Sequence, residues 1–162
     1  MSNPTTGKPA GAHLRIVPVG AGDAALLADL FARIQADPAA ARFHPHPFTA
    51  DEAAKRAAYQ GLDLYAVMAI GDEPVGYGML RGWDDGYAVP SLGIYIVEEH
   101  RGSGAGRALM DYLHLAAKLR GAPAIRLKVY QDNERARRLY EALGYGFASE
   151  SEHGQLVGRL AF

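Results

Sequence analysis

The chain has no cysteine among its 162 residues. Disulfide bonds, a thiolate nucleophile and zinc sites with sulfur ligands are therefore excluded. Long apolar runs are also missing, since no segment approaches the roughly 20 apolar residues that span a bilayer. The first ten residues are polar and lack the apolar stretch of a signal peptide. We therefore expect a disordered leader over residues 1–10 and a cytoplasmic protein with no membrane partner.

The chain as a whole also lacks a marked excess of charge, because its formal net charge is −1. The distribution along the chain is nevertheless uneven. Residues 100–140 hold nine Lys and Arg against three Asp and Glu, a net +6, while the remainder holds eight against fifteen, a net −7. Such a basic segment indicates either a bound anion or a solvated basic helix face.

The remaining composition is ordinary for a globular protein, with 49% hydrophobic and 22% charged residues in a length typical of one domain. Strand-like and helix-like segments alternate from residue 12 onward, without a repeat or a long linker. We therefore expect a single domain over residues 11–162 with the element order β α α β β β α β α β β. This order predicts an α/β (α+β) fold, a mixed sheet with helices on both faces.

Turn and capping residues mark the ends of the predicted elements. The turn from Gly71 to Pro74 favours an antiparallel hairpin, and Thr49 with Glu52 forms a capping box at a helix start. Two prolines between Arg42 and Phe48 predict a loop, ordered or disordered. The predicted strands cover 13–19, 64–70, 75–83, 90–97, 124–129 and two short segments within 146–162. The predicted helices cover 22–37, 49–60 and 133–143, and a further helix runs from the glycine-rich turn at 101–106 to residue 119.

The apolar strand at 90–97 is followed by a glycine-rich turn that begins the helix ending near Leu119. Backbone N–H groups at a helix N-terminus lack acceptors, and glycine lets a phosphate approach closely, so this turn predicts an anion site. A Walker A loop requires a lysine where Arg107 stands. The third glycine of a dinucleotide fingerprint falls on Arg107 or Leu109, so that motif fits poorly too.

The pattern Arg101-x-x-Gly104-x-Gly106 resembles the acetyl-CoA-binding motif Arg/Gln-x-x-Gly-x-Gly/Ala of the GCN5-related N-acetyltransferase (GNAT) family. The resemblance continues over 128–133 and 136–145, where the second segment looks like the family's Leu-Tyr-x-x-Leu-Gly-Phe/Tyr helix. It covers about residues 90–147. It implies the GNAT fold, whose central mixed sheet is mostly antiparallel, and acetyl-CoA as the cofactor.

The resemblance also implies roles for individual residues. The turn would hold the coenzyme pyrophosphate, the preceding strand would pair with the pantetheine arm, and Tyr140 would be the catalytic proton donor, since a phenol with a pKa near 10 stays protonated at neutral pH. Each assignment has a purely structural alternative: the glycines fit a tight turn, residues 94–96 a core strand, Tyr140 a core tyrosine and Asn133 a helix cap. The implied coenzyme-binding residues are Ile94, Tyr95, Ile96, Arg101, Gly102, Ser103, Gly104, Ala105, Gly106, Arg107 and Asn133.

The acceptor side departs from the family pattern. Many relatives carry a glutamate base at places where this chain has Val89, Pro90 and Lys128. The substrate-binding candidates are His44 and His46, since histidine is the residue type that can take up a proton near neutral pH and could act as the base directly or through water, and Asp84, which would steer a cationic amine. The alternatives are that the two histidines belong to a surface loop made rigid by its prolines and that Asp84 is an ordinary turn residue. No metal site is expected, because the His-x-His pair has no third ligand.

The resulting expectation is an acetyl-CoA-dependent N-acetyltransferase that moves acetyl directly to a primary amine of a small molecule in a ternary complex. Residues 43–48 and 77–83 look like a subgroup linked to sugar biosynthesis, which suggests an amino sugar, free or nucleotide-linked. Acetylation of a protein N-terminus or lysine and a non-catalytic acyl-CoA sensor remain alternatives. No nucleic-acid partner is expected, because aromatic residues do not alternate with the arginines. A monomer or a homodimer is expected.

Overall fold

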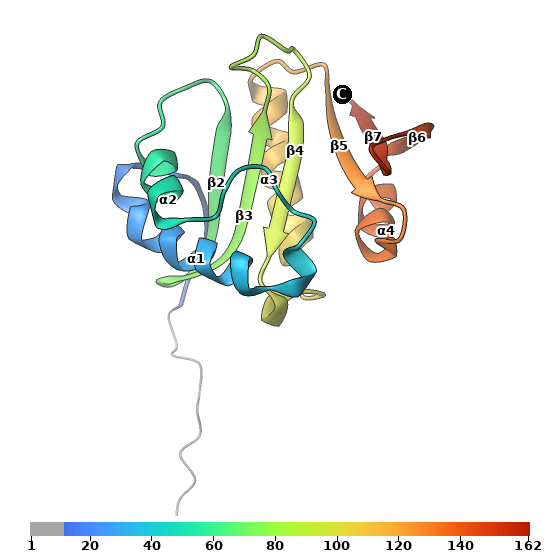
Figure 1. The fold of residues 1–162 in the computed structure, drawn as a ribbon. Coiled ribbons are helices and arrows are strands. Elements are labelled where there is room, and N and C mark those ends of the chain that lie inside the picture. The colour runs from blue at the N-terminus through green and yellow to red at the C-terminus, as the bar shows by residue number, and fades with distance from the viewer. Residues whose placement is uncertain (1–11) are drawn as a thin grey trace, which may run out of the picture.

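The structure is a computed structural model that describes residues 12–162, apart from the side chains of residues 149–152. The prediction for residues 1–10 lies outside this range. Seven strands form one sheet in the order β1-β2-β3-β4-β5-β7-β6 (Figure 1). The strands are β1 (Leu14–Pro18), β2 (Leu64–Ile70), β3 (Glu73–Arg81), β4 (Ser91–Ile96), β5 (Ala124–Tyr130), β6 (Gly146–Glu152) and β7 (Gln155–Ala161).

Within residues 12–162, four α-helices and three short 3-10 turns complete the fold. None of the helices within 12–162 can cross a membrane, and the longest, α3, has 15 residues. The helices are α1 (Ala24–Ala36), α2 (Ala50–Ala57), α3 (Ala105–Leu119) and α4 (Glu134–Ala142), and the 3-10 turns are η1 (Ala21–Asp23), η2 (Pro38–Ala40) and η3 (Glu98–His100).

The predicted order of strands and helices is confirmed, and so is the mixed, mostly antiparallel sheet, in which β4 and β5 are the parallel pair. The second hairpin strand differs in its ends, because β3 begins at Glu73 and stops at Arg81. Pro74 therefore lies inside a strand. The register shifts opposite it, between Met68 and Ala69, and such an irregularity accommodates a proline, which cannot donate to the ladder.

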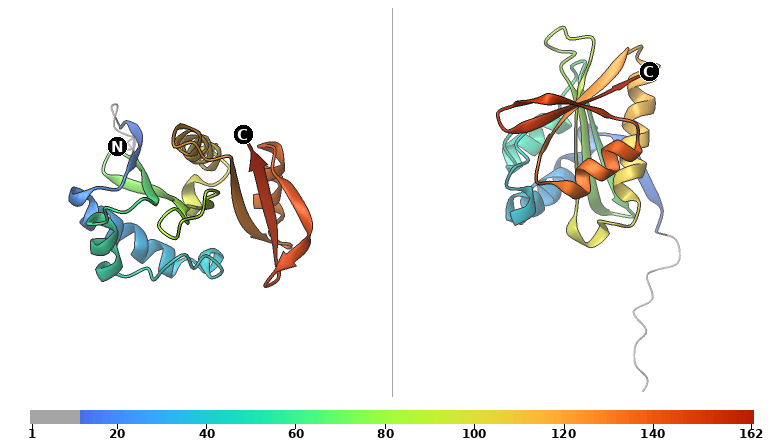
Figure 2. Two further views of the ribbon diagram at one scale, coloured as in Figure 1. Left: turned by 90° about the horizontal axis from the view of Figure 1, so that it is seen from above. Right: turned by 90° about the vertical axis from the view of Figure 1, so that its right-hand side faces the viewer.

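Neighbouring residues of β3 show why helices cover both faces of the sheet. The Tyr77 ring packs edge-on against Phe31 of α1, with 5.2 Å between ring centroids. The next residue, Gly78, faces Leu109 and Leu113 of α3. Because successive residues of a strand point to opposite faces, α1 and α3 lie on opposite sides of the sheet (Figure 2).

Gly78 allows α3 to pack directly on the sheet. A Cβ atom at this position would lie 3.1 Å from one methyl carbon each of Leu109 and Leu113. Gly78→Val is therefore expected to lower the free energy of unfolding by about 1–3 kcal/mol, the usual cost of overpacking. Chemical denaturation measures this change. Gly146→Val is the matched control, since a Cβ there meets nothing within 4 Å, and an equal loss in both variants would contradict the packing argument.

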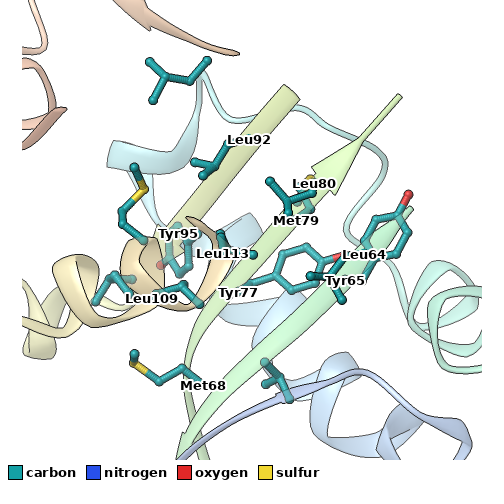
Figure 3. Packing of buried hydrophobic residues seen from close by; sticks show 14 of the residues in the cluster. Leu64, Tyr65, Met68, Tyr77, Met79, Leu80, Leu92, Tyr95, Leu109 and Leu113 are labelled. Atoms are coloured by element: carbon teal, nitrogen blue, oxygen red, sulfur yellow. The ribbon is translucent and has the colours of Figure 1, made fainter. Parts of the chain in front are cut away.

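The core fills both faces of the central strands. Figure 3 shows Tyr65 and Tyr77 from neighbouring strands together with Leu109 and Leu113 of α3. Tyr77 is fully buried, as are both leucines. On the α1 face the predicted loop is ordered by its rings, because Phe43 stacks on Tyr95 with 6.2 Å between centroids. The prolines of this loop thus do not prevent it from packing on the sheet.

Candidate active site

The glycine-rich turn leaves unpaired backbone donors at the start of α3. Gly102 and Gly104 have φ angles of +75° and +92°, in the left-handed region that glycine adopts without strain. The N–H of Ala108 donates to the Gly104 carbonyl at 3.0 Å. The N–H groups of residues 105–107 precede this first helical bond and have no acceptor within the helix. They point out of the N-terminal, positive end of the helix dipole, which suits an anion.

The strand edge beside this turn is open. Within the described chain, β4 and β5 pair at one position, Ser91 with Arg126, and Figure 1 shows β5 leaving β4 beyond it. The Val97 N–H donates to Val75 of β3 at 3.0 Å. Because backbone groups of an antiparallel strand alternate in direction, Ile94 and Ile96 direct theirs away from β3, toward β5. The structure thus puts two predicted coenzyme-binding residues on this edge, whereas the backbone of Tyr95 faces β3.

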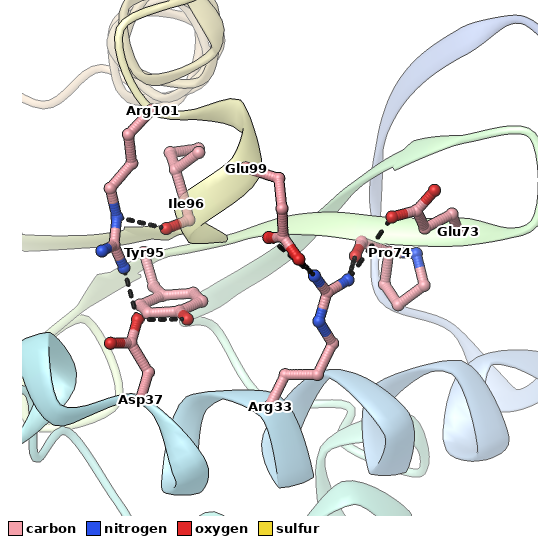
Figure 4. Close-up of polar contacts among 8 residues, drawn as sticks. All are labelled: Arg33, Asp37, Glu73, Pro74, Tyr95, Ile96, Glu99 and Arg101. Atoms are coloured by element: carbon pink, nitrogen blue, oxygen red, sulfur yellow. Dashed lines mark hydrogen bonds and ion pairs between the residues drawn. The ribbon is translucent and has the colours of Figure 1, made fainter. Parts of the chain in front are cut away.

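Two hydrogen bonds and an ion pair connect the turn, β4 and the end of α1 with one another (Figure 4). The Arg101 guanidinium lies 2.5 Å from the Asp37 carboxylate, and its Nε donates to the Ile96 carbonyl at 2.9 Å. The Tyr95 hydroxyl donates to the same Asp37 oxygen at 2.8 Å. The Arg101 side chain is therefore committed within the protein, and a direct contact with phosphate stays a prediction.

Asp37 carries its charge at neutral pH. Burial raises the pKa of this carboxyl, but hydrogen bonds from Tyr95, Arg101 and the Ala39 N–H outweigh burial, and the pKa lies below its ordinary value. In the sequence Asp37 is only the last residue of the predicted helix over 22–37, and these contacts were not predicted. No sequence signal was available, because its ion-pair partner lies 64 positions further along the chain.

Arg135 of α4 lies over the turn, since its Nη2 is 2.8 Å from where a Cβ of Gly102 would be. Arg107 is exposed at the start of α3. Arg137 and Arg138 of the +6 segment have acidic neighbours on α4, Glu141 at 3.8 Å and Glu134 at 3.6 Å, and Lys118 and Arg120 lie over the rings of Phe162 and Trp83. The part of the positive charge that bears on the turn therefore comes from Arg107 and Arg135 and from the helix dipole.

The two predicted residues from the second motif lie at the start and on the buried face of α4. The Asn133 side-chain oxygen accepts the Ala136 N–H at 3.3 Å and caps the helix. Tyr140 is buried beside Tyr145, with 5.9 Å between ring centroids. Burial raises the pKa of Tyr140 to about 12, so its hydroxyl keeps its proton at neutral pH. A contact of either residue with coenzyme A stays a prediction.

The structure brings two of the three acceptor-side candidates together. His44 and His46 line a hollow of about 450 Å³ between the end of α1 and the following loop. The His46 ring is buried, and its nitrogens lie 2.7 Å from the Pro47 carbonyl and 2.8 Å from the Tyr77 hydroxyl. Asp84 is not among the residues lining this hollow. Its carboxylate accepts the Tyr59 hydroxyl and the Leu62 N–H, which makes it an anchor of its own turn.

Two buried histidines give the fold a pH-dependent stability. Burial lowers the pKa of both His46 and His114, whose Nε2 lies 2.8 Å from the Tyr145 hydroxyl. Between the folded pKa and about 6.5, the unfolded chain binds protons that the native chain does not. The free energy of unfolding is therefore expected to fall as the pH drops below about 6.5, by up to about 1.4 kcal/mol per pH unit for each histidine.

Urea denaturation between pH 5 and 7.5 measures this slope. His114→Gln is expected to flatten it, because one of the two histidines is removed, while His13→Gln, at an exposed position, is the control. A slope that is identical in wild type and His114→Gln would contradict the assignment.

The fold and this site define a class of protein: a mixed sheet whose central strand has an open edge next to an anion-binding helix N-terminus. A family model described as the acetyltransferase (GNAT) family matches residues 29–145. The chain belongs to the GNAT family. The predicted fold, acetyltransferase class and acetyl-CoA cofactor are thereby confirmed at the level of the family.

Solved structures share this fold at low sequence identity. The ribosomal-protein-S5-alanine acetyltransferase from Vibrio fischeri is 16% identical, with a TM-score of 0.75 and 94% of each chain covered. The PaiA N-acetyltransferase from Thermoplasma acidophilum, in complex with coenzyme A, is 13% identical, with a TM-score of 0.73, covering 93% of this chain and 99% of that one. The structure of yncA from Salmonella typhimurium with its cofactor acetyl-CoA is 19% identical, with a TM-score of 0.70, covering 91% and 93%.

Proposed function

We propose that this chain is an N-acetyltransferase that moves acetyl from acetyl-CoA to a primary amine of a small molecule, directly and in a ternary complex. The observation that carries the proposal is the position of the α3 N-terminus beside the edge where β4 and β5 separate. A phosphate site and an unpaired strand edge thus lie next to each other. Coenzyme A has a pyrophosphate, which suits the helix N-terminus, and an arm with amide groups, which suits the strand edge.

The residues of the turn and the strand edge fit this cofactor. The N–H groups of residues 105–107 would hold the pyrophosphate, with charge from Arg107 and Arg135. The backbone groups of Ile94 and the N–H of Ile96 would pair with the amides of the pantetheine arm, since the Ile96 carbonyl already accepts the Arg101 Nε. When bound, acetyl-CoA supplies an acetyl group activated as a thioester. Asn133 is retained as a coenzyme contact through the part of its side chain that does not cap α4.

Tyr140 is our candidate for the catalytic proton donor. A phenol is protonated at neutral pH, and burial raises the pKa of Tyr140 further, to about 12. As a general acid it would give this proton to the coenzyme A thiolate that leaves when the amine takes the acetyl group. Cysteine is absent from the sequence, so a cysteine acyl-enzyme is excluded and direct transfer is favoured.

The acceptor amine is assigned to the side of the sheet that carries the hollow of His44 and His46. Its volume of about 450 Å³ lies in the range of small-molecule sites. His44 is exposed in this hollow, whereas both ring nitrogens of His46 have partners within the protein. We therefore favour His44 over His46 as the group that receives the amine proton, directly or through water.

Two measurements test the proposed function. Calorimetry is expected to show coenzyme A binding, and release of free thiol from acetyl-CoA is expected with at least one small amine in a panel of amino sugars, nucleotide-linked amino sugars, amino acids and polyamines. Peptides with a free N-terminus or lysine form the comparison arm. Release of free thiol with the peptides alone would indicate that the acceptor is a protein and not a small molecule. Binding without release from any amine would favour the sensor, and a chain that does not bind coenzyme A would overturn the proposal.

A further inference from the structure

Asp37 connects three segments that are far apart in the sequence (Figure 4). One carboxylate oxygen lies 2.5 Å from the Arg101 guanidinium and 2.8 Å from the Tyr95 hydroxyl. The other accepts the Ala39 N–H at 2.9 Å, which caps the short η2 turn. A single side chain therefore joins the glycine-rich turn, the central strand and the start of the loop that leads to His44.

The same contacts determine what Arg101 can do. Its guanidinium is held from two sides, by Asp37 and by the Ile96 carbonyl, and it lies over the Tyr95 ring with 5.5 Å from its carbon to the ring centroid. The side chain is about three-quarters buried. Its reach toward a ligand at the α3 N-terminus is thus restricted, and it fixes the first residue of the turn relative to β4.

We infer that Asp37 is a positioning residue of the coenzyme site, which holds the turn of residues 101–107 in its binding conformation through Arg101 and Tyr95. This inference rests on the proposed function, in which that turn binds the coenzyme pyrophosphate. Asp37 also lines the hollow of His44, but both of its carboxylate oxygens are engaged within the protein, by Ala39, Tyr95 and Arg101. It lowers the cost of binding because the donors of a fixed turn need not be ordered when the ligand arrives.

The Ala39 bond extends this role to the other side of the sheet. The residues that follow η2 form the loop whose rings cover β4, as Phe43 does on Tyr95. Since the same carboxylate caps η2 and holds Arg101, loosening it releases both the turn and this loop. Removal of Asp37 is thus expected to increase hydrogen exchange over 38–44 and over 101–104 together.

A double-mutant cycle separates positioning from direct phosphate binding. Asp37→Ala and Arg101→Ala are each expected to raise the Kd of coenzyme A about tenfold, as loss of a charged hydrogen bond would. The double variant is expected to stay near the same tenfold, because both single changes remove one interaction. Asp37→Asn keeps the shape of the side chain and part of its hydrogen bonding, so its increase should be smaller.

Glu99→Gln is the matched control. Glu99 forms the neighbouring ion pair between the turn region and α1, 2.8 Å from Arg33, and lies outside the residues 101–107. This variant is expected to leave the Kd of coenzyme A and hydrogen exchange over 101–104 unchanged. Thermal unfolding of every variant is measured alongside, because a merely structural role lowers the melting temperature without changing the Kd.

The outcomes distinguish the two proposals. A double variant with the product of the single effects, about a hundredfold, would mean that Arg101 binds the coenzyme itself and would overturn the inference. An unchanged Kd of coenzyme A in Asp37→Ala would overturn the inference as well. Where the alanine variants do not fold, Asp37→Asn and Arg101→Lys replace them, and an unchanged Kd in both would have the same meaning. A wild-type chain that does not bind coenzyme A would instead refute the proposed function on which the inference rests.

Discussion

Tyr140→Phe is expected to lower kcat by about 10²- to 10⁴-fold, the usual contribution of a general acid, while the Kd of coenzyme A changes less than about twofold. The substitution removes one buried hydroxyl and keeps the ring that packs against Tyr145. Steady-state kinetics with the best amine of the panel give kcat, and calorimetry gives the Kd. Since the pKa of Tyr140 is about 12, its deprotonation should not limit kcat below about pH 10.

Tyr145→Phe is the matched control for this variant. Tyr145 is a neighbouring buried tyrosine whose hydroxyl lies 2.8 Å from His114 Nε2. It has no part in the proposed transfer step. Its variant is expected to keep kcat and to lose about 1–3 kcal/mol of stability, because the buried His114 Nε2 is left without its hydrogen-bond partner. If Tyr140→Phe retains the wild-type kcat, Tyr140 is a core residue and the proton donor must be sought elsewhere.

Gly104→Asp is expected to raise the Kd of coenzyme A by at least about a hundredfold. The new carboxylate would stand at the start of α3, where its oxygens compete for the unpaired N–H groups and its charge repels phosphate. Two like charges 4 Å apart near a protein surface repel by about 4 kcal/mol, more than a hundredfold in Kd. Calorimetric titration with coenzyme A measures the change, and the effect should shrink at high salt.

Gly121→Asp controls for backbone strain. Gly121 lies just after the other end of α3, with φ at +79°, close to the +92° of Gly104, and a Cβ at either position meets nothing within 4 Å. Both variants therefore incur a similar conformational cost. Equal losses of coenzyme affinity in the two would show that helix stability, and not an anion site at the α3 N-terminus, explains the result.

Much of the fold was predictable because its signals are local. The turn before Pro74, the capping box at Thr49 and the apolar periodicity of each segment act within a few residues of one another. The same holds for the glycine-rich turn, whose glycines and two flanking arginines all lie within residues 101–107, whereas Arg135 reaches the turn from α4. The boundaries of β3 were less predictable, because a shifted register lets Pro74 remain in the strand, and that depends on the partner strand.

The acceptor side was predicted less well because its residues interact across long distances in the sequence. His46 contacts Tyr77, 31 positions away, which places a candidate base in an aromatic core. Asp84 contacts Tyr59, 25 positions away, which makes a candidate steering group a turn anchor. A histidine and an aspartate can each serve either a substrate or the packing of the fold. Only the positions of Tyr77 and Tyr59 show which role His46 and Asp84 have.

The sequence by itself determined the family, the order of elements and the glycine-rich turn that suits a phosphate, because backbone conformation and helix-terminal donors follow from residues next to one another. Only the tertiary structure decided that Arg101 is held by Asp37, that β5 leaves β4 after one paired position, and that Tyr140 is buried, which raises its pKa above that of an ordinary phenol. These properties depend on residues that are distant in the sequence, which exclude water from a side chain or donate hydrogen bonds to it. The packing of the folded chain determines which residues these are.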